Sequence, residues 1–282
     1  MTAERWDAHV HWLPAAAWAP AGAAWGDPWF ASCHGGRPPR YPTPEGLIAV
    51  LDAAGIDRAV VSGWPFAAPA LLREGNDHIA ALVRRFPTRL LGLATVQPAD
   101  PGCGAELLRA ARLGLVGVGE LNADGQRFGL EPEGALAELA ARCARMGWPM
   151  LLHASEPVGH AYPGKGTAGP SRLWPWLERL PERAPGLRLC LAHLGGGLPL
   201  YGAMPEVAAR CRQLWFDTAA VPFLYRSPVL EAVGAAVGYD RLCFGSDYPL
   251  LLPQRYRAAL ETLAPAARTW VEAGSARAWL LG

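Results

Sequence analysis

The sequence predicts a single α/β domain over residues 1–282, folded as a (β/α)8 TIM barrel. Three observations predict this fold. About eight short apolar segments alternate with longer amphipathic ones, and most of the apolar segments are continuous, as in parallel strands buried on both faces. The chain also has the length that eight such units need, and it contains no internal repeat or low-complexity linker, so one domain is expected.

The first expected strand covers residues 5–11 and contains Asp-Ala-His-Val-His at residues 7–11. An open, doubly wound sheet is the alternative, but such a sheet usually has a glycine-rich phosphate loop after its first strand. Here Trp-Leu-Pro follows the strand, and no GxGxxG occurs. The other expected strands cover residues 58–63, 90–96, 115–121, 149–154, 188–193, 213–218 and 241–246.

Helix signals fall between these strands. Thr43 and Pro44 are expected to begin a helix that Gly55 ends, because Thr caps a helix, Pro suits its first turn and Gly follows its last turn. The final helical segment, residues 265–281, is expected to break at Gly274. Other helices are expected over residues 76–86, 101–114, 133–146, 171–180, 204–211, 227–237 and 253–263.

A long segment, residues 12–42, separates the first strand from the first helix. A disordered insertion is one alternative, but the segment contains four tryptophans, and disordered segments are poor in aromatic residues. We expect it to fold over the barrel mouth and to shape the substrate site. It also brings His34 within reach of that site.

Composition excludes several classes of function. The net charge is +1 without a run of Lys or Arg, which argues against binding to nucleic acid or to an anionic membrane. There is no signal-like N-terminus and no apolar run near the ~18 residues of a membrane span. Six scattered cysteines without a CxxC pair are expected to be reduced core residues. These features favour a cytoplasmic protein that acts on a small molecule.

Polar residues stand where the expected strands end. His9 and His11 lie two residues apart on one strand and therefore share a face. In a barrel, the carboxyl ends of all strands surround the active-site mouth, so these side chains should converge. The fourth to eighth expected strands end with Glu120, His153, His193, Asp217 and Asp247.

Converging imidazoles and carboxylates are costly to bury unless they are paired or bind a metal. Mixed nitrogen and oxygen ligands favour Zn²⁺, with Mn²⁺, Fe²⁺ or Co²⁺ as alternatives. The alternative without a metal is a set of hydrogen-bonded core histidines. Counting by two from the polar residues predicts which strand residues face the barrel interior: Leu191 and Leu189 below His193, Leu151 below His153, and Val118 below Glu120, with Cys190 facing outward.

This ordered set of strand-end residues resembles the amidohydrolase superfamily of metal-dependent barrel enzymes. Ala-His-Leu-Gly-Gly-Gly at residues 192–197 and Phe-Gly-Ser-Asp-Tyr-Pro at residues 244–249 are similar to its amidohydrolase-related branch, which includes hydrolases, lactonases and non-oxidative decarboxylases. Within this branch the chain is most similar to a bacterial group of predicted metal-dependent hydrolases, around Gly-Val-Gly-Glu-Leu-Asn at residues 117–122.

The resemblance implies ligand roles. His9, His11 and Asp247 would hold a first metal, and His153 would be its fourth ligand or a ligand of a second metal. Glu120 would either bridge two metals or accept a hydrogen bond that orients an imidazole.

The resemblance leaves two roles open for His193, which is either a ligand of a second metal or an unligated acid/base. Asp247 is the candidate to take a proton from a metal-bound water, whose pKa the metal lowers toward ~7. Asp217 would support the ligands or cap its strand.

Residues 156–165 form a loop rich in Gly and Pro directly after His153. Glu156, His160, Tyr162 and Lys165 are candidate substrate contacts, and Lys165 could pair with a substrate carboxylate. The alternative is a rigid loop whose polar groups face solvent.

Aromatic residues also follow strand ends. Trp12, Trp64 and Tyr248 are candidate walls of an apolar pocket, and packing beneath loops is the alternative.

The expected activity is metal-dependent hydrolysis of an amide, ester or lactone. The alternative is metal-dependent, non-oxidative decarboxylation of an unsaturated or aromatic carboxylic acid at the same site. A metal-binding barrel without catalysis is the third hypothesis. A homodimer is expected from the resemblance.

Overall fold

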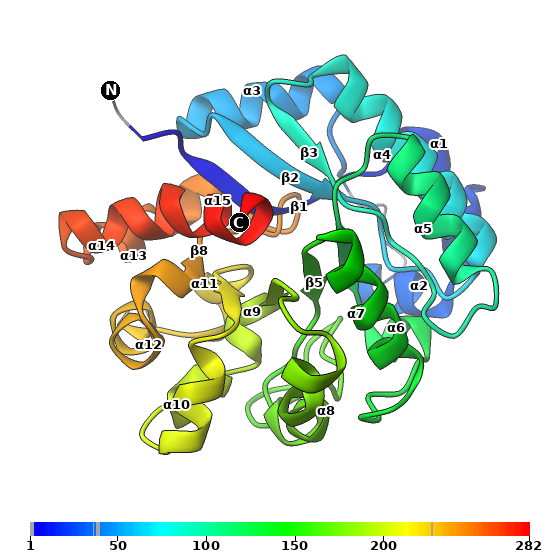
Figure 1. Cartoon of the computed structure of the whole chain (residues 1–282). Helices are drawn as coiled ribbons and strands as arrows, with labels where there is room; N and C mark the ends of the chain where they lie inside the picture. Colours follow the sequence, from blue (N-terminus) through cyan, green and yellow to red (C-terminus); the bar gives the residue numbers. More distant parts are fainter. Residues whose placement is uncertain (1–2, 36, 38–39, 227) are drawn as a thin grey trace.

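The computed structural model describes residues 3–35, 37, 40–226 and 228–282. Eight parallel strands form its centre, and each lies within one of the segments predicted from the sequence (Figure 1). The strands are shorter than expected because the last residues of most segments leave the ladder and enter loops. They are β1 (Trp6–His11), β2 (Arg58–Ser62), β3 (Leu90–Gly92), β4 (Val118–Leu121), β5 (Met150–Leu152), β6 (Leu189–Leu191), β7 (Trp215–Asp217) and β8 (Leu242–Cys243).

Two parallel sheets, β1-β2-β3 and β4-β5-β6-β7-β8, make up the ring. Single parallel bridges join them at both seams, from Ala94 to Val118 and from Val10 to Tyr248. The second seam is reinforced where the Asp247 amide donates to the carbonyl of His9 at 2.9 Å. The predicted (β/α)8 barrel is therefore the observed fold.

Helices pack outside the strands, and most of them match the predicted segments. They are α3 (Pro44–Ala54), α4 (Pro69–Arg85), α5 (Cys103–Arg112), α7 (Ala135–Met146), α8 (Pro170–Arg183), α10 (Pro205–Cys211), α12 (Val229–Val237), η4 (Pro253–Tyr256) and α13 (Arg257–Glu261). Thr43 caps α3 as predicted, since its side chain accepts from the Gly46 amide. Ser227, the first residue of one expected helix, lies outside the described residues.

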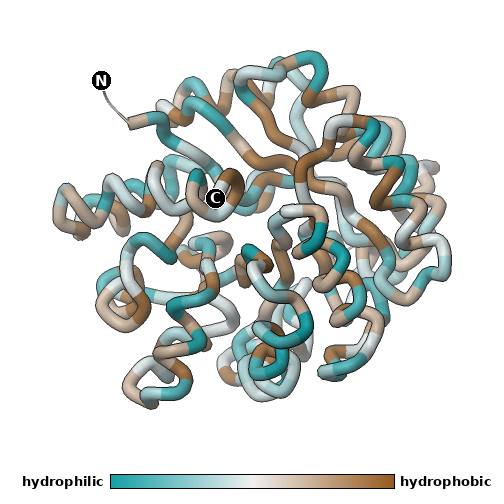
Figure 2. The backbone as a smooth tube through the Cα atoms, in the orientation of Figure 1, coloured by the Kyte–Doolittle hydropathy of each residue, from teal (hydrophilic) through white to brown (hydrophobic). Residues whose placement is uncertain are grey.

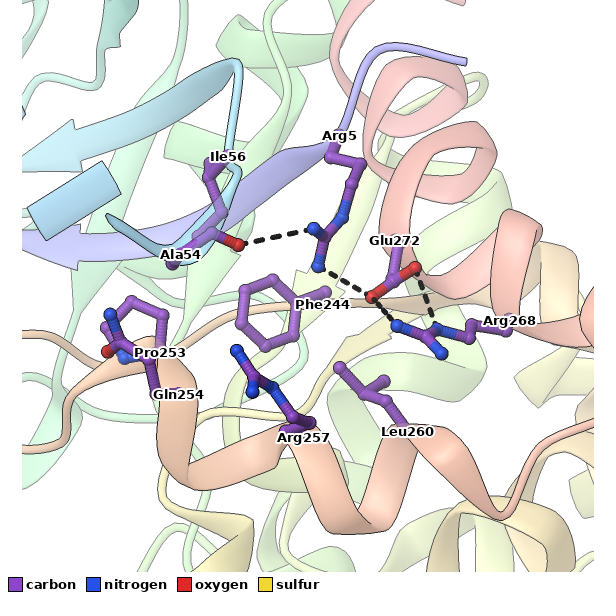
Figure 3. A pocket seen from close by; sticks show the side chains of 10 residues that line it. All are labelled: Arg5, Ala54, Ile56, Phe244, Pro253, Gln254, Arg257, Leu260, Arg268 and Glu272. Atoms are coloured by element: carbon purple, nitrogen blue, oxygen red, sulfur yellow. Dashed lines mark hydrogen bonds and ion pairs between the residues drawn. The ribbon is translucent and has the colours of Figure 1, made fainter. Parts of the chain in front are cut away.

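The expected break at Gly274 was wrong. The chain continues from α14 (Pro265–Thr269) through a π-helical segment, η5 (Trp270–Gly274), into α15 (Ser275–Leu281), and Gly274 keeps helical dihedral angles. The segment is tied to the start of β1, because Arg5 donates to Glu272 at 2.8 Å (Figure 3). Both ends of the chain are thereby joined.

Short helices occupy the segment before α3 and several of the turns between strands and helices. Within that segment Asp27 caps α2 by accepting from the Phe30 amide at 2.9 Å. Phe30 packs in an aromatic cluster with Trp25 and Trp64. These short elements are α1 (Ala15–Trp18), η1 (Ala23–Gly26), α2 (Pro28–His34), α6 (Ala123–Gln126), α9 (Ala192–Gly195), η2 (Leu198–Tyr201), α11 (Val221–Leu224) and η3 (Tyr239–Arg241).

The barrel interior holds its own apolar cluster. Side chains from seven strands meet there, and α15 closes the amino end, where the Trp279 indole donates to the carbonyl of Arg188 at 3.1 Å (Figure 1). Its members include Trp6, Ala8, Val60, Leu91, Leu151, Cys190, Trp215, Cys243 and Trp279.

The inward-facing residues predicted for two strands were wrong. Leu191, Leu189 and Val118 pack in the outer cluster between strands and helices, and Cys190 faces inward. Strand β6 ends before His193, whose φ of 56° is left-handed, so the alternation does not continue to the histidine. A register shift after Val118 interrupts the count in the same way. Leu151 does face the interior as predicted.

Hydrophobic residues concentrate along the central strands and the inner faces of the helices (Figure 2). All six cysteines are free, and five of them are buried. Within the described ranges, no helix is long and apolar enough to cross a membrane.

Candidate metal centre

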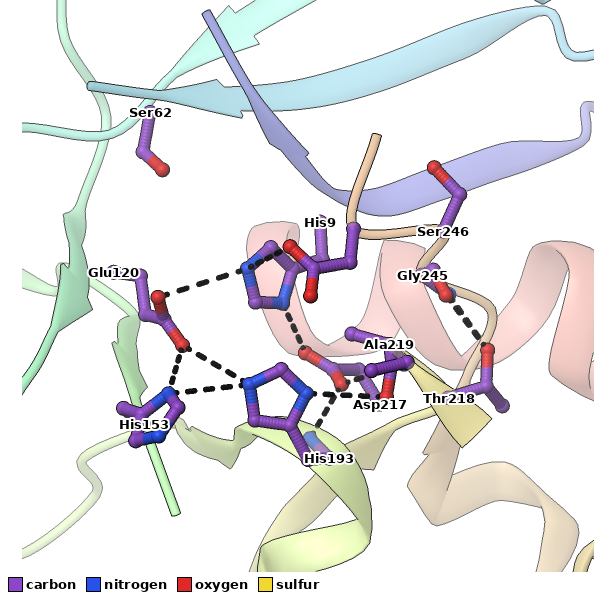
Figure 4. A network of polar contacts seen from close by, with 12 residues as sticks. His9, Ser62, Glu120, His153, His193, Asp217, Thr218, Ala219, Gly245 and Ser246 are labelled. Atoms are coloured by element: carbon purple, nitrogen blue, oxygen red, sulfur yellow. Dashed lines mark hydrogen bonds and ion pairs between the residues drawn. The ribbon is translucent and has the colours of Figure 1, made fainter. Parts of the chain in front are cut away.

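Six predicted ligand residues gather at the carboxyl ends of the strands, in two groups. Figure 4 labels four of them, His9, Glu120, His153 and His193. In each group the potential ligand atoms lie within 4.8 Å of one another. The first group is His9, His11 and Asp247, and the second is Glu120, His153 and His193. Strand ends thus bring together residues that are up to 238 positions apart in the sequence.

The first group has the proton arrangement that a metal site requires. His11 Nδ1 lies 3.1 Å from the carbonyl oxygen of Gly63, which can only accept, so Nδ1 carries the proton. His9 Nδ1 lies 2.8 Å from a carboxylate oxygen of Asp217 and carries the proton likewise.

The two remaining nitrogens, Nε2 of His9 and Nε2 of His11, face each other at 3.0 Å. Neutral imidazoles would place two lone pairs in contact there, which is unfavourable unless a cation lies near both. Two nitrogen ligands on one ion, at bonds of about 2.0–2.1 Å and tetrahedral or square angles, lie about 3 Å apart. The spacing therefore fits a shared metal ion.

The second group repeats this pattern. His193 Nδ1 lies 3.1 Å from the carbonyl of Ala219, which leaves Nε2 as the lone-pair nitrogen. That nitrogen lies 3.1 Å from Nδ1 of His153, while Nε2 of His153 contacts the Ser155 hydroxyl at 3.1 Å. The donor atom that His153 offers is therefore Nδ1.

Glu120 lies between the groups and directs one oxygen at each. Oε1 is 3.0 Å from His153 Nδ1, and Oε2 is 3.4 Å from His11 Nε2. A carboxylate with this placement can bridge two ions or accept hydrogen bonds from two imidazoles.

Negative charge exceeds positive charge in this buried ring. Burial opposes protonation of His9, but the carboxylates of Asp217 and Glu120 outweigh burial and raise its pKa to about 10. Burial likewise opposes protonation of His193, whose pKa rises to about 9 because Glu120 and Asp247 are close. A site that attracts protons so strongly also attracts a divalent cation, which would displace them.

Asp217 supports both groups from the end of β7. It is buried, and besides His9 Nδ1 it accepts from the His193 amide at 2.9 Å and the Ala219 amide at 3.0 Å. Gly245 permits this close approach, because a Cβ at that position would lie 2.9 Å from the Cβ of His9 and 3.3 Å from that of Asp217. The contact is the kind that orients a ligand histidine.

Two of the polar residues have left-handed backbone. His193 has φ of 56° and Asp247 has φ of 58°, conformations that cost L-residues roughly 1–2 kcal/mol. The surrounding hydrogen bonds hold them: the Asp247 amide donates to His9, and the His193 amide donates to Asp217. These turns direct both side chains back over the barrel.

The 156–165 loop folds on itself. Tyr162 donates to Glu156 Oε2 at 2.6 Å, and Tyr225 donates to Glu156 Oε1 at 3.5 Å. Lys165 donates to the carbonyls of Val158 and His160 at 2.7 and 3.1 Å. The Lys165 ammonium thereby fixes the loop, and its expected use for a substrate carboxylate stays a prediction.

The three aromatic residues expected to wall a pocket, Trp12, Tyr248 and Trp64, lie in different surroundings. Trp12 is buried in the outer core, and its indole donates to the carbonyl of Pro42 at 2.9 Å. Tyr248 is also buried in that core, and a role of Trp12 and Tyr248 as walls of a substrate pocket stays a prediction.

Trp64 does lie beside a candidate ligand, with its ring 6.1 Å from that of His11. The ring of His34 lies 5.1 Å from that of Trp64, so α2 from the long segment reaches the neighbourhood of the ligands.

The groups that orient the histidine rings were not predicted from the sequence. Ser155, the carbonyl of Gly63 and the carbonyl of Ala219 each contact one histidine ring. Backbone carbonyls have no residue-type signal. Ser155 lies two residues after His153, and this spacing was the only signal that could have indicated it.

Comparison with known proteins agrees with this architecture. The chain is 24% identical over 254 residues to 2-amino-3-carboxymuconate-6-semialdehyde decarboxylase of Dictyostelium discoideum, covering 74% of this chain and 67% of that protein. A manganese-bound dihydroxybenzoic acid decarboxylase from a Polaromonas species, solved with the inhibitor 2-nitroresorcinol, superposes with a TM-score of 0.76. It is 19% identical, with 99% of this chain and 97% of that chain covered.

A second solved structure, 5-carboxyvanillate decarboxylase from Sphingomonas paucimobilis, superposes with a TM-score of 0.74 at 17% identity, and 99% of each chain is covered. At these identities the structures establish the shared fold. The family model described as amidohydrolase matches residues 6–280, from the first residue of β1 to the last turn of α15. Because this match spans the whole barrel and both groups of candidate ligands, the chain belongs to the amidohydrolase family.

Proposed function

We propose that the protein is a metal-dependent, non-oxidative decarboxylase of a small aromatic or unsaturated carboxylic acid. The observation that carries this proposal is the agreement of two comparisons, since the curated relative and the two solved structures described above are all decarboxylases. Hydrolysis, the first expectation from the sequence, has less support from these relatives.

We assign His9, His11 and Asp247 as ligands of one divalent metal, with His153, His193 and Glu120 completing the ring. When bound, the metal would supply Lewis acidity, toward substrate oxygens in decarboxylation or toward water in hydrolysis. The donor set suits Zn²⁺ and also Mn²⁺, which the Polaromonas structure contains.

The residues of the site would then supply one proton to the substrate. In decarboxylation the bond between the carboxylate carbon and its neighbour breaks, CO2 leaves, and the electron pair stays on the neighbouring carbon. That carbon takes up one proton, so no oxidant or reductant is needed. Asp247, which is 8% exposed and belongs to the first group, is the proposed proton donor, and His193 is the alternative.

The substrate contacts remain a proposal as well. Glu156, His160 and Tyr162 belong to the loop that follows His153, and Trp64 lies beside His11. We propose that this loop and α2 border the substrate and limit access of water. The homodimer expected from the resemblance stays a prediction.

Hydrolysis is the second candidate, and one observation favours it. Glu120 directs one oxygen to each ligand group, at 3.0 Å from His153 and 3.4 Å from His11. That placement favours two ions bridged by a carboxylate, an arrangement well suited to activating water. A single ion would leave Glu120 as a hydrogen-bond acceptor for imidazoles.

A substrate screen in H2¹⁸O separates the two candidates. The metal-loaded protein is incubated with hydroxybenzoates, unsaturated dicarboxylates, lactones and amides, while CO2 release and ¹⁸O in the organic product are measured. CO2 release without ¹⁸O supports decarboxylation, and ¹⁸O without CO2 supports hydrolysis. Full activity of a metal-free preparation would contradict both.

Asp247→Asn serves as the test of the proposed proton donor. Its kcat should fall by about 10²–10⁴-fold, the usual contribution of a positioned acid or base. Asp240→Asn is the matched control, because Asp240 is a half-exposed carboxylate outside both ligand groups.

A further inference from the structure

A second polar cavity lies away from the metal centre (Figure 3). It has a volume of about 270 Å³ and lies between the residue before β1, the end of α3, η4 with α13, and the α14–η5 segment. Arg5 lines it and is four residues before His9, or roughly 13 Å along an extended strand. The cavity is therefore separate from the proposed site of catalysis.

Positive charge dominates this cavity. Three guanidinium groups line it, from Arg5, Arg257 and Arg268, against the single carboxylate of Glu272. Glu272 is already occupied, because it accepts from Arg5 at 2.8 Å and from Arg268 at 3.0 and 3.3 Å. Arg257 has no hydrogen bond or ion pair with any residue that the structure describes, and its side chain extends toward the ring of Phe244 in Figure 3.

Two further polar atoms of the lining are buried without a partner among the described residues. They are Nε of Arg5, a donor, and Oε1 of Gln254, an acceptor. Buried polar atoms in native proteins almost always have a partner, which is protein, water or a bound ion. A cavity with an unpaired cation, an unpaired donor and an unpaired acceptor is suited to a polar ligand.

We propose that this cavity binds a phosphate group, either free or as a small ester. Phosphate oxygens can accept from Arg257 and Arg5, for which the planar guanidinium is well shaped. The O–H of hydrogen phosphate can donate to Gln254, and a carboxylate has no such donor at neutral pH. The apolar side chains of Ile56, Phe244 and Leu260 form the rest of the wall and can contact the organic part of an ester.

The structure separates this role from a purely structural one. Arg5, Glu272 and Arg268 form an ion-paired link that joins β1 to η5 without any help from Arg257. Arg257 is exposed and makes no bond that the fold needs. Loss of its charge should therefore change anion binding and leave stability alone.

The test is calorimetric titration of the metal-loaded, full-length protein with inorganic phosphate, against a sodium chloride titration at equal ionic strength. Wild type should bind phosphate saturably. Arg257→Gln should weaken this binding roughly tenfold or more, the effect of losing one hydrogen bond to a charged group. Arg255→Gln, two residues earlier in η4 and outside the cavity lining, should bind like wild type.

Neither variant changes a proposed metal ligand, so phosphate bound at the metal centre would bind both variants equally. A difference between the variants therefore reports on the cavity. Without phosphate, the melting temperature of Arg257→Gln should equal that of wild type. Saturable phosphate binding that is equal in wild type and Arg257→Gln would overturn the proposal. The absence of saturable phosphate binding to wild type would overturn it as well. Neither result would bear on the proposed decarboxylase activity.

Discussion

At the scale of single residues, Asp217 has the clearest supporting role. Its two oxygens accept from the ring of His9 and from the amides of His193 and Ala219, so it fixes one histidine in each ligand group. The carboxylate also fixes the tautomer of His9, because it holds the proton on Nδ1 and leaves Nε2 free for a metal.

Asp217→Asn should therefore lower metal affinity by about 10–100-fold, as loss of a ligand-orienting carboxylate usually does. The amide keeps the volume of the side chain but can present its NH2 group to His9. Competition titration with a chromophoric chelator measures the affinity, and Asp240→Asn is the matched control. Unchanged metal affinity in Asp217→Asn would remove the orienting role from this residue.

Residue types at strand ends were predictable, whereas their partners were not. His9, His11, His153 and Glu120 could be identified because a polar residue at the end of an apolar strand is conspicuous. The carbonyls that orient the rings depend on the backbone path. The left-handed turn at His193 also has no signal in a single sequence, and it caused the wrong inward-facing residues in β6.

At the scale of elements, α4 shows where sequence signals mislead. The sequence predicted a helix over residues 76–86, but α4 begins at Pro69 and continues through Gly75. Gly75 is buried inside the helix, and its Cα lies 3.9 Å from where a Cβ on Gly63 would be. This close approach between α4 and the turn after β2 is a tertiary contact, so local propensity could not reveal it.

Helices α4 and α5 are joined by a buried carboxylate that sets a pH-dependent contribution to stability. Glu106 of α5 accepts from Asn76 of α4 at 2.8 Å and from Arg109 at 2.8 Å. Burial alone would raise the pKa of Glu106, but hydrogen bonds from Arg109 and Asn76 outweigh burial and lower its pKa. A lowered pKa means that folding favours the ionised form.

Glu106→Gln should accordingly lower the free energy of unfolding by about 1.5–3 kcal/mol at pH 7, the range for hydrogen bonds to a charged group. The contribution of Glu106 is complete above the unfolded pKa of about 4.3 and is lost as pH falls through the lower folded pKa. Urea unfolding at pH 7 and pH 3.5 should therefore show a smaller difference from wild type in acid. Glu261→Gln, an exposed control on α13, should show no such difference, and a pH-independent deficit in Glu106→Gln would contradict the linkage.

At the scale of the whole molecule, the ring of ligands connects the two sheets. β1 supplies His9 and His11 from one sheet, and β4, β5, β6 and β8 supply the rest from the other. The two sheets meet at two seams, where bridges pair Ala94 with Val118 and Val10 with Tyr248. A metal held by ligands from both sheets would therefore brace the barrel across the seam between β1 and β8.

Metal removal should destabilise the whole barrel rather than one loop. A ligand that binds only the folded state at 100-fold its Kd adds about 2.7 kcal/mol of stability, and 1 kcal/mol shifts the melting temperature of a chain of about this size by roughly 2–4 °C. Exhaustive chelation should thus lower the melting temperature by about 5–10 °C, and stoichiometric metal should restore it. His78→Asn, which replaces a histidine of α4 outside both ligand groups, should respond like wild type, whereas His11→Asn should have lost the response. Differential scanning calorimetry with elemental analysis of each sample makes the comparison, and a chelated protein that is free of metal yet melts at the original temperature would show that the ring does not brace the barrel.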